Sequence, residues 1–106
     1  MIARVWTAKA RKESAGRYAR HFTDHVVPAL KRIDGYKRAT LLQRVDADPA
    51  ELVVISWWTS TDAIREFAGS DIDRAVVADE AQRMLLSFDE TVRHYSVVVE
   101  DSESST

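Results

Sequence analysis

The hydrophobic pattern of the chain centres on residues 52–58 (LVVISWW), its longest nearly unbroken apolar run. Beta-branched residues dominate this run, turn-forming residues 46–49 precede it, and residues 60–62 follow with polar side chains. A run this short and this clearly bounded is typical of a strand buried on both faces. Because neighbouring side chains on a strand point to opposite faces, we expect Trp57 and Trp58 to face opposite sides of one sheet.

Three other segments have the composition or alternation of strands. Residues 2–9 alternate, with Ile2 and every second residue after it on one face. Residues 36–45 carry many charges, which predicts a strand at the edge of the sheet. Residues 91–99 are rich in valine and predict a last strand. The central strand is expected over 51–59.

Helical spacing of apolar residues predicts a first helix between the first two strands. It is expected to begin near Ser14, a suitable N-cap, and to end at Gly35. Pro28 lies inside the pattern, removes a backbone donor and clashes with the preceding turn. We therefore expect a break or kink there, with a short second turn beginning at the proline.

A second helical region is expected between the central strand and the last one. Ser60 or Thr61 should cap a short helix that ends at Gly69. Residues 71–77 predict one or two further helical turns, and a last helix is expected to begin at Asp79. The apolar residues of this last helix would be Ala81, Met84, Leu85 and Phe88.

The order of elements is β-α-β-β-α-β, which predicts an α+β fold with a split, ferredoxin-like antiparallel sheet. Right-handed crossovers place both helical regions on one face of that sheet and leave the other face bare. A bare apolar face of this size favours a homodimer in which two sheets pack face to face, with Trp57 at the interface. Residues 1–99 are expected to form one domain, and residues 100–106 an acidic, flexible tail.

The composition excludes several classes of function. The 106 residues suit one domain, and the absence of cysteine excludes disulfides, thiolate metal sites and a cysteine nucleophile. A formal net charge of −2 gives no attraction to nucleic acid or anionic membranes. The central run also lacks the basic residues of RNA-binding sheets. Without a signal-peptide pattern or a membrane-spanning run, a cytoplasmic location is expected.

Several short motifs occur together in a recognisable order. They are residues 34–36 (DGY), 58–60 (WTS), 62–67 (DAIREF) and 88–95 (FDETVRHY). In this order the chain resembles the antibiotic biosynthesis monooxygenase family of dimeric α+β barrels over residues 2–99. The resemblance implies a dimer with a small-molecule pocket between sheet and helices in each subunit. Some members oxidise polycyclic phenols to quinones with O₂ and without metal or flavin, others bind and degrade haem, and many have no assigned reaction.

The chain departs from both activities at particular positions. Haem-degrading members carry an asparagine on the first strand, a helix tryptophan and a histidine iron ligand. Here asparagine is absent altogether, and Phe67 and Val77 take the other two places. In quinone-forming members the tryptophan equivalent to Trp58 lines the pocket beside polar partners, which are replaced here by Val54 and Ile64.

The resemblance and the residues together predict a set of site residues. The expected pocket liners are Trp58, Phe67, Trp6, Tyr36 and Met84, with plain core packing as the alternative for each. Trp58 would stack on a flat substrate. His94 is the candidate base that takes a proton from a phenolic substrate, and a structural histidine is the alternative.

His21 and His25 share one helix face beside Asp24, which is compatible with a metal site, but no third ligand occurs at a recognisable spacing. We therefore expect no metal and no cofactor. The leading hypothesis is a cofactor-independent monooxygenase that uses O₂ on an aromatic or polycyclic small molecule. The alternatives are a non-catalytic small-molecule-binding module of the same fold and, as a third, a haem-binding or haem-degrading protein.

Overall fold

The first strand, β1 (Ile2–Ala10), lies inside the sheet and pairs with strands from both later parts of the chain. The structure is a computed structural model and describes residues 1–102. On one side β1 pairs along its whole length with β3 (Ala50–Trp58), from Ile2 opposite Trp58 to Ala10 opposite Ala50. On its other side β1 pairs with β4 (Ser87–Phe88) and β5 (Arg93–Ser96).

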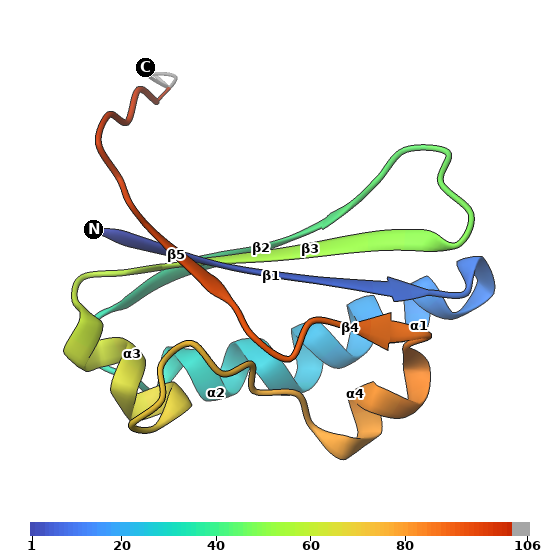
Figure 1. Cartoon of the computed structure of the whole chain (residues 1–106), viewed down its shortest axis with the longest axis horizontal. Helices are drawn as coiled ribbons and strands as arrows, with labels where there is room; N and C mark the ends of the chain where they lie inside the picture. The colour runs from blue at the N-terminus through green and yellow to red at the C-terminus, as the bar shows by residue number, and fades with distance from the viewer. Residues whose placement is uncertain (103–106) are drawn as a thin grey trace.

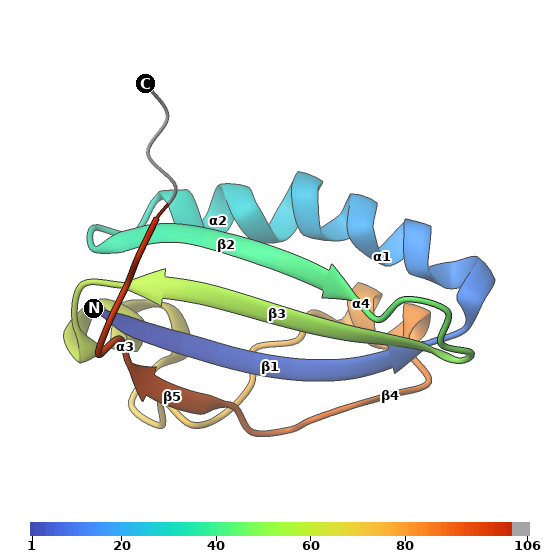
Figure 2. The same ribbon diagram turned by 90° about the horizontal axis from the view of Figure 1, so that it is seen from above.

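The second strand, β2 (Tyr36–Gln43), pairs with β3 alone and occupies an edge of the sheet, as its charges predicted. All pairings are antiparallel, and the sheet has five strands (Figure 2). Helices connect β1 to β2 and β3 to β4. The α+β, ferredoxin-like prediction is therefore confirmed.

The helical crossover after β1 contains three kinds of helix. A 3-10 turn, Lys12–Ser14, leads into α1 (Ala15–His21), a π-helical segment (Phe22–Val26) and α2 (Val27–Lys31). Ser14 occupies the N-cap position of α1, as predicted, but its side chain makes no capping hydrogen bond. The predicted irregularity is present but lies just before Pro28, in the π-helical segment, and the short helix α2 begins at Val27 with the proline in its first turn, one residue from the predicted start. There the Val27 N–H bonds to the Phe22 carbonyl in the wider π pattern.

The second helical region begins as predicted. Ser60 caps α3 (Thr61–Ala68) by accepting a bond from the Ala63 N–H, and Gly69 ends it with φ +85°. The prediction of helical turns at 71–77 is wrong beyond one hydrogen-bonded turn, in which the Arg74 N–H donates to the Asp71 carbonyl; Arg74 then forms an isolated bridge to Thr91, before β5. The Ala75 N–H donates to the Glu90 carbonyl, and the Val92 N–H donates to the Asp73 carbonyl. α4 (Asp79–Met84) then begins at the predicted residue.

The end of the chain differs most from the prediction. Phe88 belongs to β4, opposite Ala8 and in contact with the Trp6 ring, and not to the last helix. The last strand is also shorter than 91–99, since β5 ends at Ser96. Val98 and Val99 are 88% and 84% exposed, so these two valines, which predicted a strand, are not buried in the sheet. Beyond them Glu100 pairs with Arg38 at 3.2 Å, and residues 101 and 102 are exposed. Residues 103–106 of the predicted tail lie outside the described residues.

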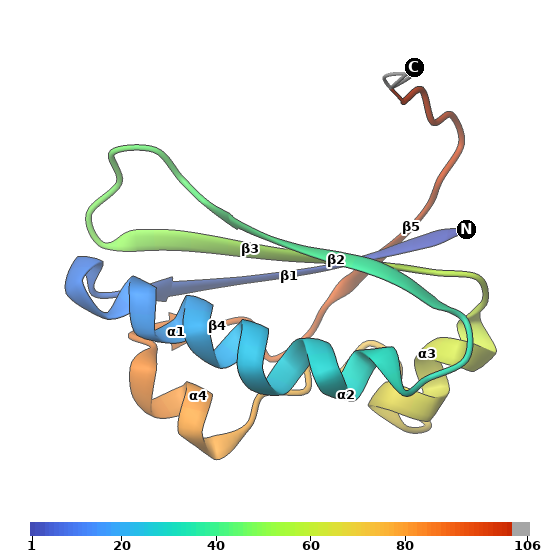
Figure 3. The ribbon, with the colours of Figure 1, turned by 180° about the vertical axis from the view of Figure 1, so that it is seen from behind.

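All helices of the described residues cover one face of the sheet (Figures 1 and 3). Trp58 points toward them and is fully buried, whereas Trp57 points to the other face, where the Arg38 guanidinium lies 4.0 Å from its ring centre. The opposite orientation of the two indoles is thus confirmed. The uncovered face also carries Leu42 and Tyr95, each about half exposed. Among residues 1–102, no helix has the length and apolar character needed to cross a membrane.

Candidate functional site

A small cavity of about 70 Å³, partly open to solvent, lies between the sheet and its helices. It separates two clusters of buried side chains, one around Trp6 and Tyr18 and one around Trp58 and Ile64. Ligand pockets in proteins are mostly apolar with a few polar groups, as this cavity is, but they commonly measure about 300–1,000 Å³, so a polycyclic ligand requires the walls to move apart. The polar side chains that line this one are Arg4, Tyr18, His21 and Ser56.

The predicted pocket residues take different places around the cavity. Trp6 and Phe67 line it. Trp58 does not; its ring stacks behind Phe67 at a centroid distance of 5.9 Å, and its indole N–H donates to Ser56 Oγ at 2.8 Å. Tyr36 packs edge-on against the far side of Trp58, outside the cavity. Met84 lines a separate surface depression next to α1.

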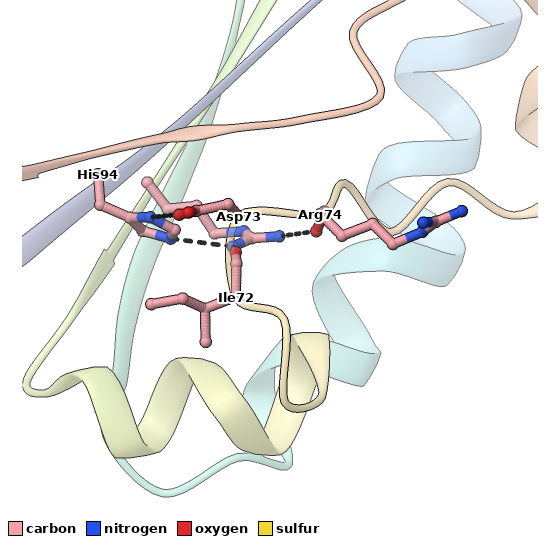
Figure 4. A network of polar contacts seen from close by, with 5 residues as sticks. Ile72, Asp73, Arg74 and His94 are labelled. Carbon is pink, nitrogen blue, oxygen red and sulfur yellow. Dashed lines mark hydrogen bonds and ion pairs between the residues drawn. The ribbon is translucent and has the colours of Figure 1, made fainter.

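Arg4 is the charged side chain of this cavity and is only 5% exposed. Its guanidinium donates to the backbone carbonyls of Ile72 and Arg74, the latter at 2.9 Å, and to Nε2 of His94 at 3.0 Å (Figure 4). Its charge also lies 5.8 Å from the centre of the Phe67 ring. Burial lowers the pKa of Arg4 to about 10, against the opposing charge of Asp73, so the guanidinium stays charged at neutral pH.

His94 lies beside this arginine and does not itself line the cavity. Because arginine can only donate, Nε2 of His94 must be the acceptor, and the proton of the neutral ring is assigned to Nδ1. Nδ1 faces the Asp73 carboxylate at 3.3 Å. Burial lowers the pKa of His94, and the Arg4 charge lowers it further, while Asp73 raises it. A base role for His94 therefore requires Arg4 to move off its ring first.

Alternation along the first strand predicts Arg4 on the same face as Trp6, but it predicts no role for the arginine. The one sequence signal that Arg4 has a special role is its charge, because it lies on the buried face of an alternating strand. Its partners, however, are backbone carbonyls of an irregular segment, which no sequence pattern reports.

A family model described as antibiotic biosynthesis monooxygenase matches residues 1–79 of the chain. The chain belongs to this family. The matched residues include the elements from β1 to α3 and the irregular segment that follows α3. They therefore contain most of the cavity wall, with Arg4. No curated protein sequence matches the chain.

Solved structures of other proteins share this family fold at low sequence identity. A variant of SnoaB, a cofactor-independent oxygenase from Streptomyces nogalater, has a TM-score of 0.71 at 19% identity over 96% of this chain and 97% of its own. MhuD, a haem degrader from Mycobacterium tuberculosis, has a TM-score of 0.62 at 16% identity over 96% and 100%. Rv0793 from the same organism has a TM-score of 0.65 at 19% identity over 95% and 98%.

Proposed function

We propose that this family member is a cofactor-independent monooxygenase that acts on a hydroxylated aromatic or polycyclic small molecule bound in the cavity. The observation that carries the proposal is one buried, charged guanidinium in a cavity with largely apolar walls. Such a site favours a flat apolar ligand with one anionic oxygen. The fold it shares with SnoaB, itself a cofactor-independent oxygenase, agrees with this choice.

The reaction needs no outside reductant, because the substrate supplies the electrons. A hydroxyarene and O₂ give a quinone and water: one oxygen atom enters the ring, and the other leaves as water with two hydrogens from the substrate. The rate depends on forming the electron-rich phenolate that reacts with O₂. A guanidinium beside the phenolic oxygen favours this anion, because an opposite charge lowers the pKa of an acid.

In this proposal each site residue has a distinct role. Arg4 turns from His94 to the phenolate, and the freed Nε2 of His94 accepts the phenolic proton. Phe67 and Trp6 form walls that exclude water from the reacting ring. Trp58 supports Phe67 from behind, and its bond to Ser56 fixes the hydroxyl at the cavity wall.

The proposed assembly is a homodimer in which the uncovered sheet faces of two subunits pack against each other. Trp57, Leu42 and Tyr95 lie on this face and are all at least partly exposed. Exposed apolar patches on soluble proteins commonly mark interfaces. A second subunit would cover the indole of Trp57 and the row of valine and isoleucine residues beside it.

A non-catalytic binding module is the second candidate, and one observation favours it. The Arg4 guanidinium already bonds to two carbonyls and to His94, so three of its N–H groups are occupied before any ligand enters.

The third alternative, haem degradation, is not supported by the residue at the position expected for the iron ligand. Val77 lines the cavity there and carries no ligand atom.

Oxygen consumption tests the proposal. A panel of dihydroxyphenols and anthrones is offered to the wild type and to the Arg4→Met and His94→Ala variants, with Arg65→Met on the exposed side of α3 as the matched control. We expect uptake above the uncatalysed rate for the wild type and the control, and its loss in the two cavity variants. Binding measured by quenching of tryptophan fluorescence, without any uptake across the panel, would instead establish the binding module.

A further inference from the structure

Two histidines of the first crossover and one glutamate of α4 converge on the side of the helical layer. One ligand atom from each of His21, His25 and Glu80 lies within 4.8 Å of the other two. We propose that these three residues bind a divalent transition-metal ion. The inference is independent of the proposed oxygenase activity and concerns the opposite wall of the cavity.

The three residues come from elements that pack against each other. His21 ends α1, and His25 lies in the π-helical segment that follows. Their rings are 5.3 Å apart between centroids and point to the same side of the helix axis. Glu80 stands in the first turn of α4, which runs beside α1 (Figure 3). It supplies the third group that the sequence spacing lacked.

The strongest indication is an unsatisfied nitrogen. His21 is 6% exposed, and none of the described residues 1–102 supplies its Nδ1 with a hydrogen-bond partner. Buried polar atoms almost always have a partner, so each exception needs an explanation. A carboxylate oxygen of Glu80 lies 4.0 Å from this nitrogen, which is too far for a hydrogen bond. An ion between the two atoms would satisfy both.

The donor set indicates which ions fit. Two imidazole nitrogens and one carboxylate oxygen suit Zn²⁺ and its neighbours in the first transition row, whereas Mg²⁺ and Ca²⁺ prefer oxygen ligands alone. Zinc binds nitrogen and oxygen at about 2.0–2.2 Å, which requires ligand atoms somewhat closer together than 4.8 Å. His25 and Glu80 are exposed and can rotate inward, while His21 is held in place by burial. Three protein ligands also leave a coordination position open.

The surroundings neither exclude nor strongly attract a cation. The depression is also lined by Arg17, Arg20 and Asp24, so with Glu80 two positive and two negative formal charges balance there. Binding would therefore depend on coordination and not on a general acidic field. The π-helical segment that follows His21 and contains His25 is a second pointer, because such segments occur frequently at functional sites. Since His21 also lines the cavity, a bound ion would fix the orientation of one cavity wall.

Titration with Zn²⁺ tests the proposal on tag-free protein first treated with a chelator. Calorimetry is expected to show one Zn²⁺ per subunit, and Co²⁺ in its place should give the absorption bands of a low-symmetry site. Glu80→Gln and His25→Gln should each weaken binding at least about tenfold, as the loss of supporting groups commonly does. Glu66→Gln, an exposed glutamate of α3 outside the depression, is the matched control and should bind like the wild type.

Thermal unfolding adds a readout that does not depend on any activity. Zn²⁺ should raise the Tm of the wild type and of Glu66→Gln, because an ion that binds the folded state stabilises it, and should leave that of Glu80→Gln nearly unchanged. Both ligand variants are at exposed positions, so they should fold normally. The proposal is overturned if the wild type binds no stoichiometric Zn²⁺, or if both ligand variants bind as tightly as the control.

Discussion

Arg4 and His94 face each other directly across neighbouring strands, and the arginine donates to Nε2 of the histidine at 3.0 Å. The pair joins β1, β5 and the irregular segment that contains Ile72 and Arg74 into one polar network under the helices. The network therefore has a structural role, whatever ligand the cavity binds. It places a positive charge at the cavity wall and keeps the histidine neutral.

Arg4→Met should lower the free energy of unfolding by about 2 kcal/mol, since hydrogen bonds from charged donors contribute about 1.5–3 kcal/mol. The methionine keeps much of the volume but leaves the carbonyls of Ile72 and Arg74 without their donor. Urea unfolding measures the loss. Arg65→Met, whose exposed ion pair with Asp62 contributes little, should change stability by less than about 1 kcal/mol. Equal effects at both positions would contradict the role assigned to Arg4.

The lowered pKa of His94 predicts how stability changes with pH. Because the unfolded chain binds this proton more readily than the folded one, stability is complete above the unfolded pKa of about 6.5. It is lost as the pH falls through the lowered pKa of the folded state. The Tm of the wild type should therefore fall below about pH 6.5, and His94→Gln should flatten this dependence. An unchanged slope in that variant would show that other groups cause it.

Gly35→Ala should destabilise the fold by about 1–3 kcal/mol, the usual cost of a strained backbone position. Gly35 has φ +101°, and an added Cβ would lie 2.7 Å from both the Ala63 Cβ and the Thr59 Oγ1. Thermal unfolding measures the cost.

Gly16 supplies the matched control for that substitution. It lies in α1, and a Cβ there meets no atom within 4 Å. Gly16→Ala should therefore leave stability unchanged or raise it by about 0.5–1 kcal/mol through helix propensity. Similar losses at the two glycines would mean that the close approach at Gly35 does not constrain the fold.

Trp57→Glu should convert the proposed dimer to a monomer. A carboxylate on the uncovered sheet face would lose its hydration if two such faces packed together, and the neighbouring Arg38 would offset only part of that cost. Sedimentation or light scattering measures the mass. Lys31→Glu places the same charge on the helical side at an exposed position and should remain dimeric. A wild type that is monomeric at micromolar concentration would refute the proposed interface.

The sequence predicted those parts of the fold that depend on local patterns. Alternation placed the two adjacent indoles on opposite faces, and Ser60 and Gly69 marked the ends of α3 correctly. Long-range partners were beyond such patterns. Phe88 has helical spacing, yet it pairs with β1 because Trp6 offers it a contact. The residues around Arg4 and the third member of the histidine cluster likewise come together only through tertiary structure.

The inside position of β1 has a consequence for how the protein is made. Residues 2–5 cannot complete their pairing until residues 93–96, about ninety positions later, have been translated. Until then one edge of β1 is bare, and a nascent chain would offer it to any strand nearby. Folding of this sheet must therefore finish late in synthesis, and loss of β5 should expose the strand that holds Arg4.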